Sequence, residues 1–270
     1  MGPIPSDRRV SKRTNARSAT ILKLMNHVYE AVIFVIYSFL APIVTAGGSM
    51  ITTNALHIFV NTNIIKATGL TSSFFLVNTI ISLYVFRKEV VWRDAKNLLI
   101  PCVLGSFIGA LFLVNMKPII LLFFMFIFSV YYVYKKVTNI DSTTIIKDSF
   151  WKEQLIGLFA GAVTGAALPG GGFLNSYFAS KGFTLSQMFG TISFLLPIVF
   201  LIKISVMLEA KIIKPDDLIG VVYALPFLMV SNILIRKGMI KLSKTVTDRL
   251  TVLAMSILSI YLLVSIISLI

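Results

Sequence analysis

The sequence has little of what metal, redox or catalytic sites require. Cysteine occurs once, as Cys102 inside an apolar run, which excludes a disulfide within the chain and a thiolate metal cluster. The two histidines, His27 and His57, are too few and too far apart to predict a zinc site. We therefore predict that the protein uses no metal and no cofactor.

Carboxylates are also scarce, with 11 Asp and Glu in 270 residues, most of them in loops between apolar runs. Acid-base catalysis inside a membrane needs paired carboxylates or clustered histidines on the spans, so we predict that the protein is not an enzyme. The glycine run at 170–172 lacks the lysine and the preceding soluble strand of a nucleotide-binding phosphate loop. An ATPase of that type is excluded.

Apolar residues, in contrast, are abundant. They make up 57% of the chain, and the mean hydropathy of +0.89 is that of an integral membrane protein. The apolar runs have the length of membrane helices, roughly 17 to 25 residues, rather than the alternating pattern of a barrel. The predicted fold is all-α, a polytopic membrane helical bundle with about eight full spans, in the cell membrane and most simply the plasma membrane of a prokaryote. The expected spans cover 28–46, 70–86, 98–114, 118–134, 155–168, 185–208, 218–235 and 250–270.

The net charge of +14 comes from 25 Lys and Arg, nearly all of which lie in the N-terminal tail and in the loops. This pattern indicates membrane topology and contacts with lipid headgroups rather than nucleic acid. If the short segments after the glycines re-enter, each half has four spans; if they cross, each half has five. Either scheme places one basic segment on the disfavoured side, so the orientation stays open.

Two glycine-rich interruptions organise the chain, TAGGSMIT at 45–52 and ALPGGGFLNS at 167–176. A break exposed to lipid would leave peptide groups unpaired at several kcal/mol each, so such a break must line a cavity or be buried in protein. Each interruption is followed by a short helical segment, broken or re-entrant. The sequence thus predicts two short segments in addition to the full spans.

The two halves can be superposed. GGSMITTN matches GGGFLNSY, TSSF at 71–74 matches TISF at 191–194, and Asp94 matches Asp216 in the charged loops. This pattern predicts a basic polar tail at 1–24, a first transmembrane repeat at 25–137, a linker at 138–153 and a second repeat at 154–270. Repeats with interrupted helices are typical of secondary transporters, which work by alternating access around a midplane site between the repeats.

Glycine lets an anion approach peptide nitrogens, and a helix that begins there offers free N–H groups and the positive end of its dipole. Hydroxyl and amide side chains nearby can add hydrogen-bond donors. The alternatives are that the glycines serve only close helix packing and that the hydroxyls bond to their own helices. The candidate substrate-binding residues are Gly170, Gly171, Gly172, Asn175, Ser176, Thr191 and Ser193 in the second half, and Gly47, Gly48, Ser49, Thr52, Thr53, Thr71 and Ser72 in the first.

Three ionisable residues are candidates for charge or proton coupling. Lys203 can balance an anion at membrane depth, or it can extend to the interface near Lys211. His57 can couple a proton, or it can be a hydrogen-bonded interface histidine. Glu30 forms an i, i+3 pair with His27, which is either a coupling pair or an interfacial anchor.

The combination of GGGFLNS, AGGSMIT, the TSS and TIS segments, and FRKEVVWRDA before CVLGSFIGALF resembles the sulfite exporter TauE/SafE family of permeases, from about Val28 onward. The resemblance implies export or uptake of a small, often sulfur-containing anion such as sulfite, a sulfonate or a related organosulfur acid, coupled to protons. The alternatives are a passive anion channel on the same scaffold and an accessory membrane protein without flux. A homodimer is one hypothesis for its assembly.

Overall fold

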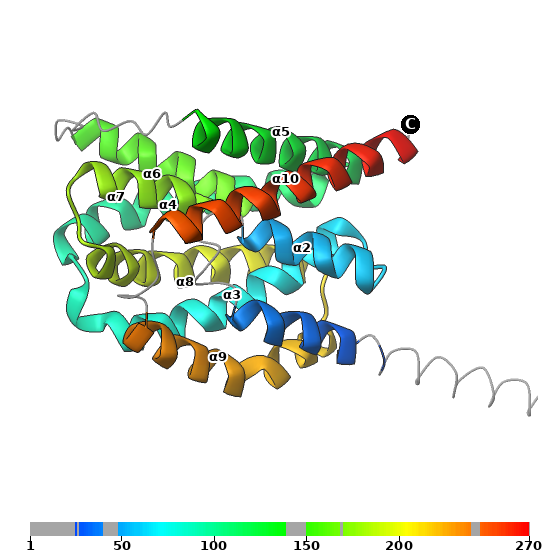
Figure 1. Cartoon of the computed structure of the whole chain (residues 1–270), viewed down its shortest axis with the longest axis horizontal. Coiled ribbons are helices and arrows are strands. Elements are labelled where there is room, and N and C mark those ends of the chain that lie inside the picture. Colours follow the sequence, from blue (N-terminus) through cyan, green and yellow to red (C-terminus); the bar gives the residue numbers. More distant parts are fainter. Residues whose placement is uncertain are drawn as a thin grey trace, which may run out of the picture.

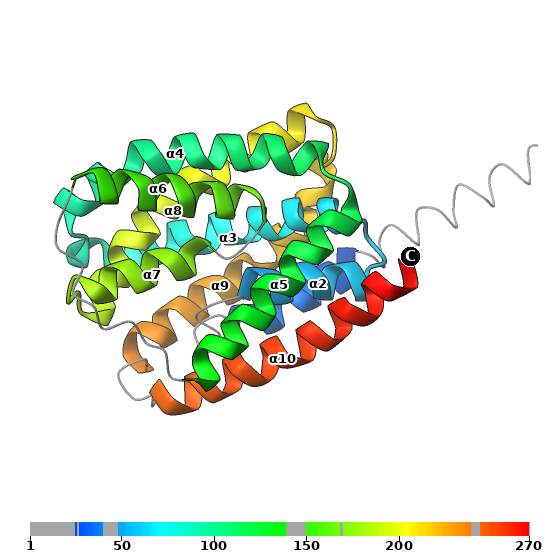
Figure 2. The ribbon, with the colours of Figure 1, turned by 90° about the horizontal axis from the view of Figure 1, so that it is seen from above.

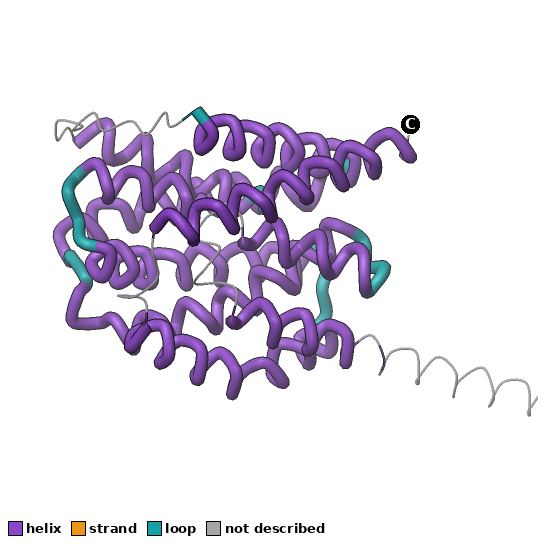
Figure 3. Tube along the Cα trace, viewed as in Figure 1, coloured by secondary structure: helices purple, strands orange, loops and turns teal. Residues whose placement is uncertain are grey.

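The computed structural model describes residues 25, 27–39, 48–138, 150–167, 170–238 and 244–269, and all secondary structure in these ranges is helical, as Figure 3 shows. The helices are His27–Phe39, α2 Gly48–Phe59, α3 Ile64–Phe86, η1 Arg87–Glu89, α4 Trp92–Asn115, α5 Pro118–Val137, α6 Phe150–Gly165, α7 Gly170–Ser180, α8 Leu185–Glu209, η2 Pro215–Leu218, α9 Ile219–Gly238 and α10 Lys244–Leu269. The all-helical class is confirmed. The predicted tail at 1–24 and most of the predicted linker lie outside the described residues.

Six of these helices are long and apolar enough to cross a membrane: Ile64–Glu89, Trp92–Asn115, Pro118–Val137, Leu185–Glu209, Pro215–Leu234 and Arg249–Ser268. The fold is therefore that of a polytopic helical membrane protein. The expected count of about eight is not met among the described residues. At 28–46 the structure describes only the short apolar helix His27–Phe39, and α6, expected as a span, has 16 residues.

Local sequence signals explain where several helices begin. The side chain of Asn63 accepts a hydrogen bond from the N–H of Ile65 at the start of α3. Thr184 and Gln187 form a capping box at the start of α8, and Pro118 occupies the first turn of α5. Each device satisfies or removes an N–H that has no partner within the helix, so these helix starts are determined locally.

The helices run between two ends of the bundle, which we call the η1 end and the η2 end after the short helix that each contains (Figures 1 and 2). α3, α5 and α9 run from the η2 end to the η1 end, whereas α4, α8 and α10 run the opposite way. Helix His27–Phe39 comes from the η2 end and α2 returns to it, while α6 comes from the η1 end and α7 returns to it. The two helices of each such pair reverse direction within the bundle, which explains why they are shorter than a span.

α3 and α8 pack against each other at the centre, and each begins beside the loop that follows the other. A methyl group on Gly69 of α3 would lie 2.7 Å from Ile213 and 2.9 Å from Met207. A methyl group on Gly190 of α8 would lie 2.9 Å from the carbonyl oxygen of Phe86 and 3.1 Å from the backbone nitrogen of Val90. The contacts are thus reciprocal between the two halves of the chain.

α4 and α6 approach each other through small residues. A methyl group on Gly105 would lie 2.0 Å from the carbonyl oxygen of Leu158, and one on Gly109 would lie 2.1 Å from that of Ala162. From the other side, a methyl group on Gly161 would lie 2.2 Å from the Cys102 carbonyl oxygen. Glycines at four-residue spacing bring backbones together in this way in membrane proteins, where dispersion contacts rather than water drive packing. The reversing pair of the second half is therefore held tightly, through α6, to α4 of the first half.

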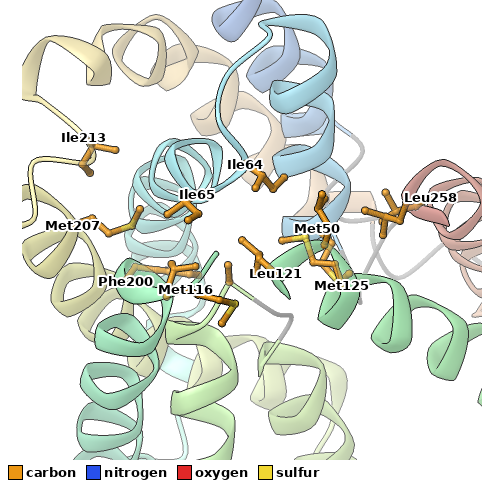
Figure 4. Packing of buried hydrophobic residues seen from close by; sticks show 14 of the residues in the cluster. Met50, Ile64, Ile65, Met116, Leu121, Met125, Phe200, Met207, Ile213 and Leu258 are labelled. Carbon is orange, nitrogen blue, oxygen red and sulfur yellow. The ribbon is translucent and has the colours of Figure 1, made fainter. Parts of the chain in front are cut away.

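A cluster of buried apolar side chains lies between the two reversing pairs, helix His27–Phe39 with α2 and α6 with α7. Part of it is shown in Figure 4. It joins Met50 in the first turn of α2 with Ala167, which precedes α7, and includes Leu121, Met125 and Phe200 from α5 and α8. Methionine is prominent here, and its flexible thioether lets it fill irregular space and repack. This cluster fills the space in which the sequence predicts the midplane site.

Candidate functional site

The second glycine interruption lies between α6 and α7. Gly170 is buried, and a methyl group there would lie 2.0 Å from Thr164 Oγ1 and 2.2 Å from the carbonyl oxygen of Ala160. Gly170 therefore serves the close packing of α7 on α6. A methyl group on Gly171 would meet only Leu196 Cδ1, at 3.6 Å. Gly171, rather than Gly170, leaves space beside the first turn of α7, where the N–H groups of a helix are free to bind an anion.

The polar residues further along α7 lie apart from this first turn. Asn175 is partly exposed, and Ser176 is exposed and donates its hydroxyl proton to the Gly172 carbonyl oxygen at 3.1 Å. Ser176 also lines an open, mainly apolar pocket of about 320 Å³ between α6 and α7, with Leu155, Ile156, Phe159, Phe173, Tyr177 and Ser180. Ser176 thus follows the alternative in which the hydroxyl bonds to its own helix.

The first interruption is closed by an aromatic side chain. Gly48 is buried beneath the hydroxyl of Tyr37, which occupies the space that a Cβ would need. Thr52 donates to the Gly48 carbonyl oxygen at 2.9 Å, again within its own helix, and Ser49 is partly buried. Gly47 lies outside the described residues. Close packing therefore explains Gly48, the glycine of this interruption whose surroundings the structure describes.

Two predicted site residues of the first half contact each other. Thr53 of α2 donates to the hydroxyl oxygen of Thr71 in α3 at 3.0 Å, and both side chains are buried. Ser72 donates to the Thr68 carbonyl oxygen one turn earlier in α3. The structure therefore joins the short helix and the following long helix through one pair of hydroxyls.

Their counterparts in the second half make different contacts. The Thr191 hydroxyl oxygen accepts a hydrogen bond from the backbone N–H of Val91 at 3.1 Å, which attaches the start of α8 to the loop after η1. Ser193 is buried, and its carbonyl is the one that Pro197, four residues later in α8, leaves without a helical donor. Thr191 is thus engaged between the halves of the chain.

Lys203 lies inside the bundle. Its side chain is in α8, the residue is 2% exposed, and Nζ donates to the Thr164 carbonyl oxygen at 3.5 Å. Because a lysine that extends to the interface would expose its ammonium, the structure favours the buried alternative over an interfacial position near Lys211. The ammonium lies at the C-terminal end of α6, where the helix dipole favours a cation.

The other two coupling candidates lie away from both interruptions. His57 is in the last turn of α2, and its Nδ1 is 2.6 Å from the Thr62 carbonyl oxygen. Glu30 is 6% exposed and its Oε2 is 3.1 Å from Nδ1 of His27, which confirms the predicted i, i+3 contact. Both residues lie toward the η2 end, and a methyl group on Gly220 of α9 would lie 2.9 Å from Glu30 Cβ.

An ionic cluster at the η1 end was not predicted from the sequence. Lys181, which follows α7, forms ion pairs with Asp94 of α4 and with Glu153 of α6. Tyr177 and Asn97 also donate to the Glu153 carboxylate. Three elements that are distant in sequence therefore meet at one ammonium.

The surroundings of Glu153 and Lys181 keep both side chains ionised. Burial acts to raise the pKa of Glu153, but hydrogen bonds from Lys181 and Tyr177 outweigh it and place the pKa below its usual range. Burial acts to lower the pKa of Lys181, but its bonds to Asp94 and Glu153 outweigh that and raise the pKa. The cluster is thus charged at neutral pH.

A second ion pair links the halves at the η2 end. Lys66, in the first turn of α3, donates to Asp217 in η2 at 2.8 Å. In each pair the lysine follows the short helix of one half, and the aspartate lies beside the charged loop of the other half. Asp217 rather than Asp216, which the superposed loops match to Asp94, provides this lysine contact.

One more polar group beside the first interruption was not among the predicted site residues. Asn54 of α2 is 1% exposed and donates to the Met50 carbonyl oxygen at 2.8 Å. Its Oδ1 is buried and has no hydrogen-bond partner among the residues that the structure describes. Such an acceptor is costly to leave unpaired. The polar character of 52–63 was visible in the sequence, but the sequence does not show which of these side chains is buried.

The six long apolar helices are those of a multi-pass membrane protein. The chain matches the family described as Sulfite exporter TauE/SafE over residues 30–262, so it belongs to that family. The family comprises membrane transporters of sulfite-type anions rather than enzymes. Comparison with curated proteins and with solved structures gave no match.

Proposed function

We propose that the protein is a secondary transporter that moves a small sulfur-containing anion, such as sulfite, a sulfonate or a related organosulfur acid, across the plasma membrane of a prokaryote. Transport is coupled to protons and proceeds by alternating access around a midplane site. The family membership supports the class of substrate. The finer statements rest on the arrangement of the two halves.

Two inverted repeats provide the moving parts. Each consists of a reversing pair of short helices and three spans, 25–137 in the first and 154–270 in the second. The first pair lies toward the η2 end and the second toward the η1 end (Figure 1). Opposite orientation of two related units is the arrangement in which rocking of one against the other exposes a central site to each side in turn.

The single observation that carries this proposal is the reciprocal pair of ionic contacts. Lys181 with Asp94 links the halves at the η1 end, and Lys66 with Asp217 links them at the η2 end. Breaking one link while the other holds would open one end of the bundle and keep the other closed. Two contacts of this kind at opposite ends are consistent with alternating access by rigid-body motion of the two halves.

The site itself lies between the interruptions. Gly171 and the first turn of α7 offer backbone N–H groups, and the Thr53–Thr71 hydroxyl pair lies at the start of the corresponding region of the first half. The apolar cluster that includes Met50 and Phe200 lies between them. It can repack when the anion enters, because methionine side chains adapt readily.

Flux into proteoliposomes tests the proposal. Purified protein is reconstituted, and uptake of labelled sulfite or methanesulfonate is measured with and without an imposed pH gradient. Saturable uptake that the gradient accelerates supports coupled transport. Uptake that ignores the gradient and does not saturate identifies a passive channel, and no uptake of any small anion by folded protein identifies an accessory role.

A further inference from the structure

Lys203 is the one buried lysine without a carboxylate partner among the described residues. The buried charged residues in these ranges, besides Lys203, are His27, Glu30 and Glu153. Glu30 contacts His27, and Glu153 is paired with Lys181, whereas none of the acids that the structure describes lies within ion-pair distance of Lys203. An ammonium removed from water without a counter-charge costs several kcal/mol, so it calls for a functional explanation.

The surroundings of Lys203 connect it to the second glycine interruption. Its one hydrogen bond to a described residue is donated to the carbonyl oxygen of Thr164, at 3.5 Å, which is long for a hydrogen bond. The same threonine lies directly against Gly170, the first residue of α7. The ammonium thus lies close to the turn where Gly171 leaves space beside free N–H groups.

No nearby acid can be supplied by the segments next to the interruptions. Residues 40–47 and 168–169 are outside the described residues, but their sequences, LAPIVTAG and LP, contain no charged side chain. Among the described residues and in these two segments, the positive charges available to a ligand at this place are therefore the Lys203 ammonium and the partial charge at the start of α7.

We propose that Lys203 binds the charge of the transported anion and that the single ammonium selects monovalent anions, such as a sulfonate or hydrogen sulfite, over divalent ones such as sulfate. This rests on the proposed transport function and specifies its substrate class. A monoanion between Lys203 and the first turn of α7 neutralises the ammonium. A dianion leaves one negative charge unpaired in an apolar site, with a cost similar to that of the lysine alone.

The alternative is that Lys203 only fastens the end of α6 through Thr164. The two roles predict opposite effects of Lys203→Met. Loss of a structural contact lowers the thermal midpoint, whereas loss of an unpaired buried charge leaves the midpoint unchanged or raises it. Only the binding role predicts that the response to an anion is lost.

The experiment uses full-length protein in detergent and in proteoliposomes, with methanesulfonate as the monoanion and sulfate as the dianion. Lys96→Met is the matched control, because Lys96 is exposed on α4. We expect methanesulfonate, but not sulfate, to raise the thermal midpoint of the wild type and of Lys96→Met. Lys203→Met should show no such rise, and its methanesulfonate uptake should fall at least about tenfold, the loss expected for one charged hydrogen bond.

Equal methanesulfonate uptake by Lys203→Met and wild type overturns the assignment of Lys203 while leaving the transport function intact. Wild-type protein that takes up no small anion overturns the transport function itself. If Lys203→Met does not fold, competition in the wild type decides the matter. Sulfate that competes with methanesulfonate uptake as well as unlabelled methanesulfonate does overturns the selection for monovalent anions.

Discussion

Lys181 lies 2.5 Å from Asp94, although the two residues are 87 positions apart in the sequence. The contact joins the residue after α7 to the first turn of α4, and the same ammonium also pairs with Glu153 of α6. One lysine therefore holds two halves of the chain together at the η1 end. This makes it the most informative residue for stability measurements.

Replacing Lys181 with methionine should destabilise the fold strongly. The side chains of Lys181, Asp94 and Glu153 are 10%, 13% and 10% exposed, so the substitution leaves two largely buried carboxylates without their cation. The expected loss is roughly 3 kcal/mol, typical of removing one partner from a buried pair. Thermal or denaturant unfolding in detergent measures it, with Lys96→Met as the exposed control. A loss no larger than that of the control would contradict a structural role for the cluster.

The same cluster predicts how stability depends on pH. Because the pKa of Glu153 is lowered in the folded state, its contribution is fully present above the unfolded pKa of a glutamate and is lost as the pH falls through the folded value. Because the pKa of Lys181 is raised, its contribution is present below the unfolded pKa of a lysine and is lost only at very alkaline pH. The thermal midpoint should thus be level near neutrality and fall in acid below about pH 4. Glu153→Gln should lower the thermal midpoint at neutral pH and reduce its fall in acid. If the fall in acid is unchanged, other carboxylates cause it.

The ion pair at the η2 end should contribute less. The Lys66 side chain is 34% exposed and that of Asp217 is 14% exposed, so water screens their attraction. We expect Lys66→Met to cost about 0–1 kcal/mol, the range for exposed pairs. A double-mutant cycle with Asp217→Asn measures the coupling directly. A coupling as large as that between Lys181 and Glu153 would show that side-chain exposure does not determine which ion pair stabilises the fold more.

Adjacent glycines at the second interruption should respond differently to the same substitution. Gly170→Ala places a methyl group 2.2 Å from the Ala160 carbonyl oxygen, so the backbones must separate and the thermal midpoint should fall. Gly171→Ala meets only Leu196 at 3.6 Å and should keep the wild-type midpoint. If Gly171 borders the anion site, Gly171→Leu reduces uptake in protein that still folds. Normal uptake by folded Gly171→Leu would move the site elsewhere.

Much of the fold could be predicted from the sequence, because a membrane requires long apolar helices. The bounds of α5 and α8 lie close to those of the apolar runs at 118–134 and 185–208, whereas α4 begins at Trp92, before its predicted run at 98–114, because its first turns carry charged and polar side chains. The direction of the chain after an interruption could not be predicted, since hydropathy measures the length of a run and not whether it continues or reverses. This is why α6 was expected as a span although it forms a reversing pair with α7.

The candidate site was less accessible to prediction. The hydrogen bond between Thr53 and Thr71 was not predicted, although both residues could be anticipated as candidates from the polar side chains on successive helices. The burial of Lys203 could not, because α8 is apolar on most of its surface and its sequence does not show which face meets α6. The Lys181–Asp94 contact joins a residue that follows α7 to the first turn of α4, and only the folded arrangement of the helices brings the two together.

The central claim is that the two halves carry a small anion through the membrane with a proton gradient as the driving force. The most direct measurement is uptake of labelled sulfite or methanesulfonate into proteoliposomes, compared with and without a pH gradient and with Lys96→Met alongside. Our account predicts saturable, gradient-dependent uptake by the wild type and by Lys96→Met. Protein that is shown to be folded but moves no small anion under either condition would contradict it.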